Sequence, residues 1–407
     1  MWRVTFAKTT KEYFLHYWWL VAIVLLGGGL AFAFPHLFHS VYPLDELHRD
    51  LAVVTRMKAG VYPLIGPPAS VGGIYFGPVY YYLLYLGALV TGFSLYGLLL
   101  VGWLSWCVTG VMLIYVTWRW YRDPYIVCVA TGLYGFSILT FQLAQYVSNP
   151  NFVPLCALLF FYGLERCMHL SPGRRYRWIL LVAISFGIGT QLHAAACIGM
   201  VVAGLVSLKW LKPALREYGI GLLLIVSMYV PYISYEYAHG FPNAHGLLTL
   251  LIGPHVYISF FDRILGYVQF WISTILSTHG FFNVLGLSNM YFFPVFVCAL
   301  CAIPFLVHLN KRTLRTSHQA LPVAENAQIV MGIWFFAPTM VYLLPIGALG
   351  GLQIYYYLLL MPLAFILGAY YIVLFWRRGW RLVIAYSVVF IALLAFYQQW
   401  LYHAVTR

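Results

Sequence analysis

The sequence predicts an all-α protein that crosses a membrane many times, and three properties lead to this fold class. Of the 407 residues, 63% are hydrophobic and only 8% are charged. The mean hydropathy is +0.84. Long apolar runs alternate with short basic clusters, and in lipid such runs must be helical, because a helix satisfies its own backbone hydrogen bonds. A soluble fold is therefore excluded.

Apolar windows of about twenty residues predict about 11–12 transmembrane helices. The first lies near 14–34, and a hydrophilic segment at 35–73 follows it. Further spans are expected near 74–92, 95–117, 124–141, 150–168, 178–191, 193–208, 218–237, 291–309, 328–347, 353–375 and 381–401, with a weaker candidate at 256–276. No soluble domain is expected, so residues 1–407 are interpreted as one transmembrane domain.

The basic residues predict which loops share a membrane face. The net charge is +13, and Lys and Arg lie mainly in short connectors, which is the positive-inside pattern rather than a nucleic-acid-binding pattern. Nucleic acid is not an expected partner. The connectors should be cytoplasmic, at 118–122, 174–177, 209–216, 311–315 and 377–381. The opposite face then receives 35–73, 145–151, 191–193, the later outer loop 238–256, and 348–357.

This scheme contains one conflict. Two full crossings between residues 74 and 117 would place Arg119 and Arg122 outside, against the charge rule. Either one of these segments does not span or the rule fails locally. The short spans 178–191 and 193–208 are expected to form a bent hairpin with its tip at Gln191-Leu192-His193.

The hydrophilic segment contains an unusual concentration of acids. The chain has only ten Asp and Glu residues, yet Asp45, Glu46 and Asp50 fall within six positions. Pro43 and acids in the following turn are typical of a helix start, and apolar residues recur at helical spacing between Leu44 and Lys58. The pattern predicts an amphipathic helix on the membrane surface.

A helical wheel separates the acids of this helix. At 100° per residue, Asp45, Arg49 and Arg56 share one face, whereas Glu46 and Asp50 point away from it. Such an arrangement argues against a pair of carboxylates acting on one bond. It favours a single base beside an anion.

A loop rich in Gly and Pro follows, from Gly60 to Pro78, and leads into Tyr80-Tyr81-Tyr82. The order of these elements resembles the GT-C class of integral-membrane glycosyltransferases, and within it the bacterial family-39-like branch. The elements are a surface helix that opens with Asp-Glu after the first span, a loop rich in Gly and Pro, and an aromatic helix. The GT-C class includes protein O-mannosyltransferases and aminoarabinose transferases. The likeness extends over most of the chain, to Ser148-Asn149-Pro150 with Pro154, Gln191-Leu192-His193, Pro231 with Glu236 and Asn243, and Tyr355-Tyr356-Tyr357 with Pro362.

The resemblance implies a GT-C-like fold and an inverting transfer of a sugar from a polyprenyl-phosphate donor to an acceptor hydroxyl. It implies an integral protein of the bacterial inner (cytoplasmic) membrane whose active site faces the periplasm. Asp45 matches the first-loop aspartate of the class and is expected to take the proton of the acceptor hydroxyl. Arg49, Arg56, Lys58 and His193 are expected near the donor phosphate, whose negative charge grows as it leaves.

Other residues are candidates for sugar or acceptor binding, and each also has a structural interpretation. Glu46 could cap the surface helix and Asn149 could cap a helix end. Lys58, a candidate for the donor phosphate, could instead extend to lipid headgroups. Tyr355 belongs to a cluster typical of membrane-interface belts. Gln191 and Glu236 complete the set of candidates. No metal site is assigned and no cofactor is expected, although a divalent cation at Asp45 and Glu46 is left open.

Rival functions remain at this point. A lipid-linked glycan polymerase or ligase would work at the same face, but such enzymes usually carry a late outer loop rich in Arg, and 238–256 contains neither Arg nor Lys. A flippase or other transporter would place polar residues along a path near the membrane midplane. A non-catalytic membrane subunit is the last alternative. The sequence identifies neither the sugar nor the acceptor, and a lipid-linked or small glycan is the acceptor class expected.

Overall fold

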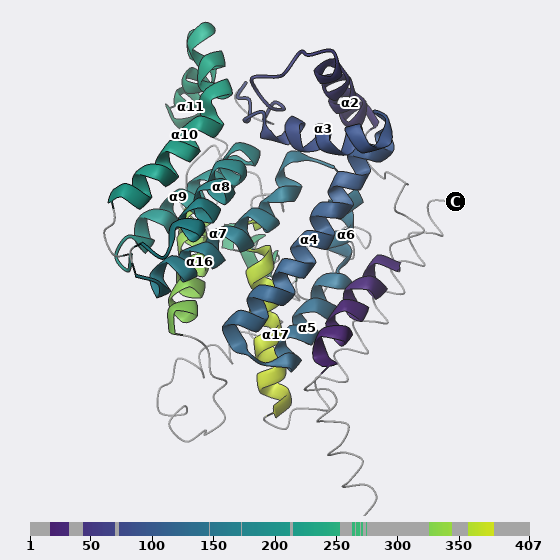
Figure 1. Cartoon of the computed structure of the whole chain (residues 1–407), viewed down its shortest axis with the longest axis vertical. Coiled ribbons are helices and arrows are strands. Elements are labelled where there is room, and N and C mark those ends of the chain that lie inside the picture. The colour runs from purple at the N-terminus through teal and green to yellow at the C-terminus, as the bar shows by residue number, and fades with distance from the viewer. Residues whose placement is uncertain are drawn as a thin grey trace, which may run out of the picture.

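The computed structural model describes residues 17–31, 44–69, 73–145, 147–171, 173–211, 215–252, 325–343 and 357–377, with a few positions between 263 and 274. The described residues form a bundle of helices (Figure 1). The helices are α2 (Leu44–Lys58), α3 (Val79–Thr91), α4 (Leu95–Tyr121), α5 (Pro124–Gly135), α6 (Ile138–Gln145), the short 3₁₀ helix η2 (Asn149–Phe152), α7 (Val153–His169), α8 (Tyr176–Leu192), α9 (Ala194–Ser207), α10 (Leu215–Ala238), α11 (Pro242–Ile252), α16 (Glu325–Leu343) and α17 (Met361–Arg377). A further helix, Tyr17–Ala31, precedes them. The predicted all-α class is confirmed.

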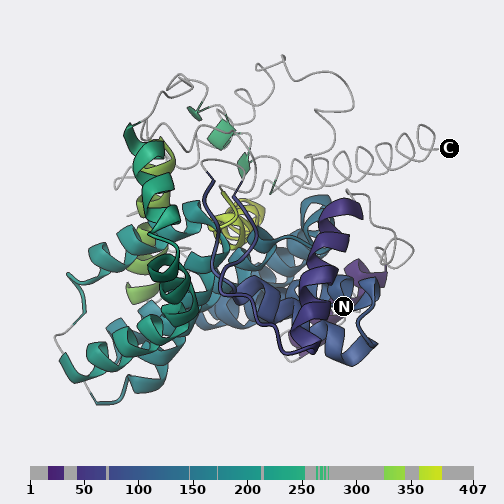
Figure 2. The ribbon, with the colours of Figure 1, turned by 90° about the horizontal axis from the view of Figure 1, so that it is seen from above.

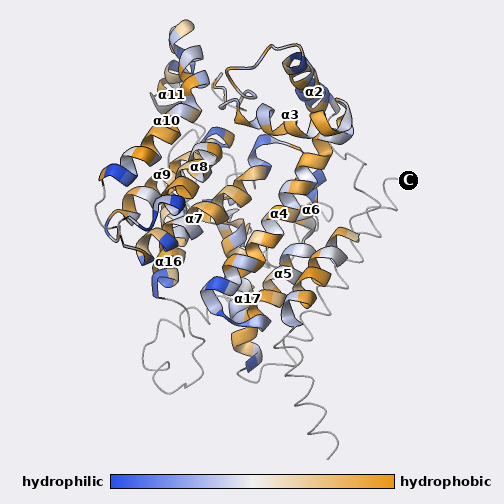
Figure 3. Cartoon of the chain, viewed as in Figure 1, coloured by the Kyte–Doolittle hydropathy of each residue, from blue (hydrophilic) through white to orange (hydrophobic). Residues whose placement is uncertain are grey.

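Several helices have the length and composition that a membrane crossing requires. These are α4, the continuous pair of η2 and α7, and α10, while α5 and α6 together would make a fourth crossing with a bend of 53°. Hydrophobic residues dominate α4, whereas α2 is largely hydrophilic (Figure 3). The predicted spans 291–309 and 381–401 lie outside the described residues, so the total of 11–12 stays a prediction.

The predicted span 74–92 is wrong. Gly77 and Pro78 keep the chain out of a helix until Val79, and α3 has only 13 residues. At 1.5 Å per residue it is about 20 Å long, too short for a hydrocarbon core of about 30 Å. Figure 1 shows α3 lying across one end of the bundle, beside α2. Without this crossing, only Tyr17–Ala31 and α4 cross the membrane before Arg119, so Arg119 lies on the same side as the start of the first helix and the conflict with the charge rule disappears.

Three further segments show how local sequence modifies the predicted elements. The surface helix has the predicted bounds, Leu44–Lys58. The bent hairpin is also present, since His193 is extended (φ −157°, ψ 135°) between α8 and α9. The predicted outer loop 238–256, in contrast, contains α11, which starts at Pro242 after Phe241 adopts a left-handed φ of 59°.

Aromatic side chains fill the core between the helices. Trp334 of α16 stacks on Phe161 of α7 with ring centroids 4.5 Å apart, and its edge meets Trp120 of α4. The Trp334 indole also donates a hydrogen bond to Leu359 O, 2.7 Å away. Because these rings join α4, α7, α16 and the start of α17, they fix the bundle on which the surface segments rest.

Candidate active site

Four segments that are distant in sequence meet at one end of the bundle. They are the loop with described residues 63–69 and 73–78, the connection at 147–151, the break at 191–193 and the turn between α10 and α11. Figure 2, which looks onto this end, shows the segment after α2 running across the bundle. The backbone N–H of Gly77 donates to Gln191 O at 3.2 Å, and Tyr75 N–H donates to Asn243 Oδ1 at 2.6 Å. The loop is therefore docked onto both helix ends.

Glycines allow this loop to pack closely. Gly66 and Phe76 form a hairpin contact, with Gly66 N–H donating to Phe76 O at 2.7 Å. A Cβ added at Gly66 would lie 2.1 Å from Gly77 O, and one at Gly77 would lie 2.3 Å from Gln191 Oε1. A side chain at Gly66 would push the two limbs of the loop apart, and one at Gly77 would displace the Gln191 side chain of α8.

The surface helix α2 carries its polar residues on two different sides. Asp45, Arg49 and Arg56 are exposed, as the wheel predicts, whereas Asp50 is buried with Leu47, Val54 and Met57 against the bundle. This places Asp50 on the apolar face, at the spacing i+3 from Leu47 and i−4 from Val54. The sequence reasoning missed Asp50, although this spacing was the signal that could have identified it.

Asp50 has two hydrogen-bonding partners from different elements. The Tyr80 hydroxyl of α3 lies 2.7 Å from Asp50 Oδ2 and 3.0 Å from Val147 O. Arg49 Nε donates to Asp50 Oδ1 at 2.9 Å, and Arg49 Nη2 lies 2.8 Å from the same oxygen. Burial raises the pKa of Asp50, while the bonds from Arg49 and Tyr80 act in the opposite direction. Asp50 therefore joins α2 to α3 and holds one edge of the Arg49 guanidinium.

Asp45, Arg49 and Arg56 are all exposed, as the shared helix face predicts, but they are not paired with one another. Arg49 pairs with Asp50 instead, and within the described part of the chain neither Asp45 nor Arg56 forms an ion pair. The physical reason is that a buried carboxylate needs a partner more than an exposed one does. The predicted face is present, but its members are not bonded to each other.

The remaining predicted phosphate-binding residues lie in different surroundings. Lys58 ends α2 and places its ammonium 4.8 Å from the Phe93 ring centroid. His193 stacks on Phe76 of the docked loop, with ring centroids 6.0 Å apart. Burial lowers the pKa of His193 to about 4. At neutral pH this imidazole is uncharged, so it can donate a hydrogen bond but does not act as a cation.

Glu236 organises the turn between α10 and α11. Its Oε1 accepts from Asn243 Nδ2 at 2.6 Å and from Asn243 N–H at 3.2 Å, and its Oε2 accepts from Ala244 N–H at 3.2 Å. Asn243 in turn accepts from Tyr75. Glu236 thus acts as an N-terminal cap of α11 and fixes the amide that holds the loop.

Asn149 and Gln191 are close to each other in the structure. Asn149 Nδ2 donates to Leu192 O, and the buried Gln191 Nε2 donates to Gly187 O at 3.1 Å and to Met228 O at 3.2 Å. Both side chains donate hydrogen bonds to nearby backbone carbonyls. For Asn149 this bonding supports the interpretation as a helix cap over the interpretation as a ligand-binding residue. Tyr355 lies outside the described residues, and Glu46 is half-buried in the first turn of α2.

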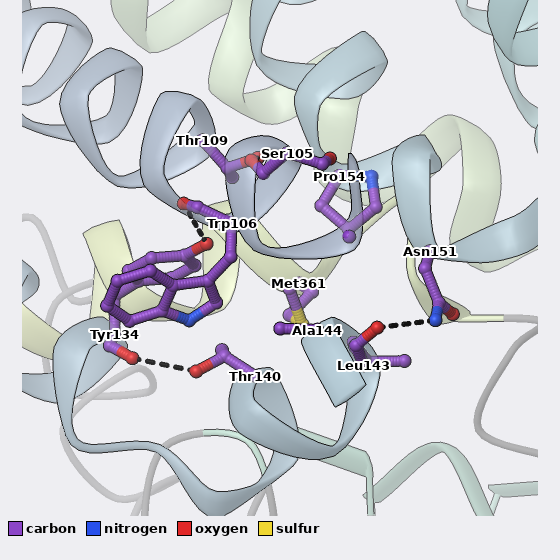
Figure 4. A pocket seen from close by; sticks show the side chains of 11 residues that line it. Ser105, Trp106, Thr109, Tyr134, Thr140, Leu143, Ala144, Asn151, Pro154 and Met361 are labelled. Atoms are coloured by element: carbon purple, nitrogen blue, oxygen red, sulfur yellow. Dashed lines mark hydrogen bonds between the residues drawn. The ribbon is translucent and has the colours of Figure 1, made fainter. Parts of the chain in front are cut away.

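A small cavity is lined by residues of α4, α5, α6, η2, α7 and α17 (Figure 4). Its volume is about 20 Å³, enough for a water molecule but not for a sugar. Ser105, Thr109, Thr140 and Asn151 give it polar lining. Asn151 Nδ2 donates to Leu143 O across it, at 2.5 Å.

The candidate metal ligands are the carboxylates of Asp45 and Glu46. In the described ranges, no three His, Cys, Asp or Glu side chains gather as ligands would. Asp45 and Glu46 are adjacent in sequence, and together they would supply only part of the six or more oxygens that Mg²⁺ or Ca²⁺ takes.

Comparisons with known proteins give a structural relative but no sequence relative. No protein-family model matches the chain, and no curated protein sequence matches it. The solved structure of ArnT from Cupriavidus metallidurans bound to undecaprenyl phosphate superposes with a TM-score of 0.58 at 15% identity, over 93% of this chain and 62% of that one. The chain has a GT-C fold. It spans about three fifths of the length of the ArnT chain.

A second solved structure is similar to the chain, with a lower TM-score. The oligosaccharyltransferase of Archaeoglobus fulgidus in its apo form matches 93% of this chain with a TM-score of 0.46 and 12% identity. ArnT and this oligosaccharyltransferase are both GT-C membrane glycosyltransferases. The ArnT superposition alone supports the GT-C fold, and at this identity it concerns the fold and not the reaction.

Proposed function

We propose that this GT-C protein is an inverting glycosyltransferase that moves a sugar from a polyprenyl-phosphate donor to an acceptor hydroxyl. The observation that carries the proposal is the superposition, over nearly the whole chain, on a protein that binds undecaprenyl phosphate. The surface helix and docked loop at one end of the bundle support it, because a lipid-borne donor has to be reached from the membrane interface.

In the proposed reaction, the acceptor oxygen attacks the anomeric carbon from the face opposite the phosphate. The bond between that carbon and the phosphate oxygen breaks, and polyprenyl phosphate leaves with the electron pair. The acceptor proton passes to the carboxylate of Asp45, which is exposed in the first turn of α2. Asp45 suits this role better than Asp50, whose oxygens already accept bonds from Arg49 and Tyr80.

Arg49 is proposed to bind the donor phosphate. Asp50 holds Nε and Nη2 of its guanidinium, while its side chain remains 39% exposed. A phosphate can approach the exposed part, where a guanidinium forms short, charge-assisted hydrogen bonds. Arg56 and Lys58, near the end of α2, add positive charge, and His193 enters the proposal as a neutral donor.

We place the site at the outer face of the bacterial cytoplasmic membrane. Arg119, Arg122, Arg177 and Arg377 lie at helix ends on the other side of the bundle from α2, which is the distribution that the positive-inside rule requires. The acceptor is proposed to be a lipid-linked or small glycan. The segment 238–256 contains neither Arg nor Lys, which disfavours a glycan ligase.

The test begins with the lipid that co-purifies with the detergent-solubilised chain. Native mass spectrometry should detect a bound polyprenyl phosphate, and added undecaprenyl phosphate should raise the melting temperature, while undecaprenol, which lacks the phosphate, should not. Undecaprenyl-phosphate sugars in nanodiscs should then release undecaprenyl phosphate when an acceptor glycan is present. If undecaprenyl phosphate neither binds nor shifts the melting temperature, the proposal fails.

A further inference from the structure

Three helices bring arginines together at the end of the bundle opposite α2. Tyr115 of α4 and Tyr162 of α7 have their hydroxyl oxygens 3.2 Å apart, and the Tyr162 ring meets the edge of the Trp178 indole of α8 at 5.4 Å. One helical turn farther on, Arg119 follows Tyr115 and Arg166 follows Tyr162 on the same helix faces. The aromatic contacts thus set the position of the cations.

Two of these cations share one aromatic ring. The guanidinium carbons of Arg166 and Arg177 lie 5.4 Å and 5.0 Å from the Trp178 ring centroid. We call Arg119, Arg166, Arg177 and Trp178 the arginine cluster.

The arginine cluster lacks a matching anion. Across the described ranges, none of its arginines forms an ion pair, and the buried Arg166 Nε has no hydrogen-bond partner. Glu165, although adjacent, is not close enough to pair. Arg175, two residues before Arg177, shows the contrast, because its Nε lies 2.5 Å from Glu217 Oε2 in a fully buried pair. Burying a guanidinium N–H without a hydrogen-bond acceptor costs free energy, unless a ligand supplies the acceptor.

The surface next to the arginine cluster indicates the source of that ligand. Val111 and Tyr115, about two and one helical turns before Arg119 on α4, and Leu180 and Ile184, about one and two turns after Arg177 on α8, are exposed apolar side chains. They continue from the cations along the sides of the helices. An anion with hydrocarbon chains could contact both parts at once, whereas a free phosphate would use only the arginines.

We propose that the arginine cluster is a binding site for the phosphate headgroup of an anionic phospholipid, with its acyl chains along α4 and α8. The site belongs to the leaflet opposite the proposed transfer site and does not depend on that function. Arg166 and Arg177 donate to the phosphate oxygens, Arg119 adds a third charge, and Trp178 holds the two stacked guanidiniums in place.

Lipid titration of the full chain in detergent, read by native mass spectrometry, tests the proposal. Phosphatidylglycerol should bind saturably, and phosphatidylcholine with the same acyl chains should bind at least tenfold more weakly. The double variant Arg166→Gln/Arg177→Gln should weaken phosphatidylglycerol binding roughly 20-fold, since each arginine near a membrane surface contributes about a factor of five. Arg119→Gln, at a partly buried position, should weaken it about fivefold.

A matched control is available on the same side of the bundle. Lys209 stacks on Trp210 at 5.3 Å, outside the arginine cluster, so Lys209→Gln should change phosphatidylglycerol binding by less than about twofold. Equal binding of the two lipids, unchanged binding by the double variant, or an equal loss in the Lys209 variant would each overturn the proposal. Complete competition by millimolar inorganic phosphate would do so too, because it would identify a site for the soluble anion.

Discussion

The two ends of the helix bundle bury charge in different ways. At the loop end, two carboxylates are buried and their oxygens accept hydrogen bonds. Asp50 accepts from Arg49 and Tyr80, and Glu236 accepts from backbone amides of α11. The opposite end also contains paired carboxylates, Glu217 with Arg175 and Asp123 with Arg377. The arginine cluster there differs, because its arginines rest on aromatic faces and Arg166 has a buried nitrogen without a partner. A carboxylate that is already bonded is poorly suited to accept a proton, whereas an incompletely bonded guanidinium can still bind an anion.

This difference separates structural acids from a chemical one. Asp50 and Glu236 each hold two elements together, so their loss should displace α2 and the loop at 73–78. Asp45 forms no bond to any described side chain and is exposed. Within α2, the acid available for chemistry is therefore the one that contributes least to the fold.

The largest effect is expected from Asp45→Asn. Removing a general base typically lowers turnover by about 10²–10⁴-fold, and the exposed position should leave folding unchanged. Transfer from an undecaprenyl-phosphate sugar should fall by this factor while the melting temperature stays the same. His48→Gln, an exposed change in the same helix, is the control. Full activity in the Asp45→Asn variant would remove Asp45 from the mechanism.

Periodicity and spacing predicted much of the fold because these are properties of local sequence. The surface helix Leu44–Lys58 and the break at His193 are examples, since apolar spacing, an acidic first turn and short apolar runs are readable directly. The span 74–92 was wrong because a hydropathy window averages over Gly77 and Pro78, which delay the start of α3. Residues 242–252 read as a loop because α11 depends on a cap supplied by Glu236.

The candidate site was less predictable because its bonds are formed between distant segments. A wheel correctly placed Asp50 away from Asp45, but it could not show that Tyr80, thirty residues later, would lie against it. It likewise placed Arg49 beside Asp45, while burial of Asp50 determined the actual pairing. The roles of Asp45 and Arg56 remain predictions.

Asn243→Ala should produce the next largest effect, at the loop. The change removes the acceptor for Tyr75 N–H and one of the donors to Glu236, but the two backbone donors remain. Losing this hydrogen bond should lower the free energy of local opening of the loop by about 1–1.5 kcal/mol. Amide hydrogen exchange at 73–77 should therefore accelerate about tenfold. Thr249→Ala, which removes only a bond within α11, should leave this exchange unchanged. Equal acceleration in both variants would mean that α11 as a whole is destabilised.

Asp50→Asn should have a smaller effect, on donor binding. Asn retains an oxygen that can accept from Tyr80, but it loses the charge that orients Arg49. The KM for the polyprenyl-phosphate donor should rise about fivefold with kcat little changed, equivalent to about 1 kcal/mol of lost charged hydrogen bonding. Arg49→Gln should show a similar rise, and the double variant no additional one. Additive losses would separate Asp50 from the action of Arg49.

The smallest effect is expected in the pH dependence of stability. Because burial raises the pKa of Asp50 in the folded chain, the folded state keeps this proton at pH values where the unfolded chain, with an aspartate pKa of about 3.9, has lost it. The contribution of Asp50 to the free energy of unfolding therefore falls as pH rises from that value through the raised pKa, and is constant above it. The Glu46 charge strengthens this trend, while Arg49 and Tyr80 oppose it. The difference in melting temperature between the wild type and Asp50→Asn should accordingly shift toward the variant as pH rises above about 4. A shift toward the wild type would mean that the Arg49 pair outweighs burial.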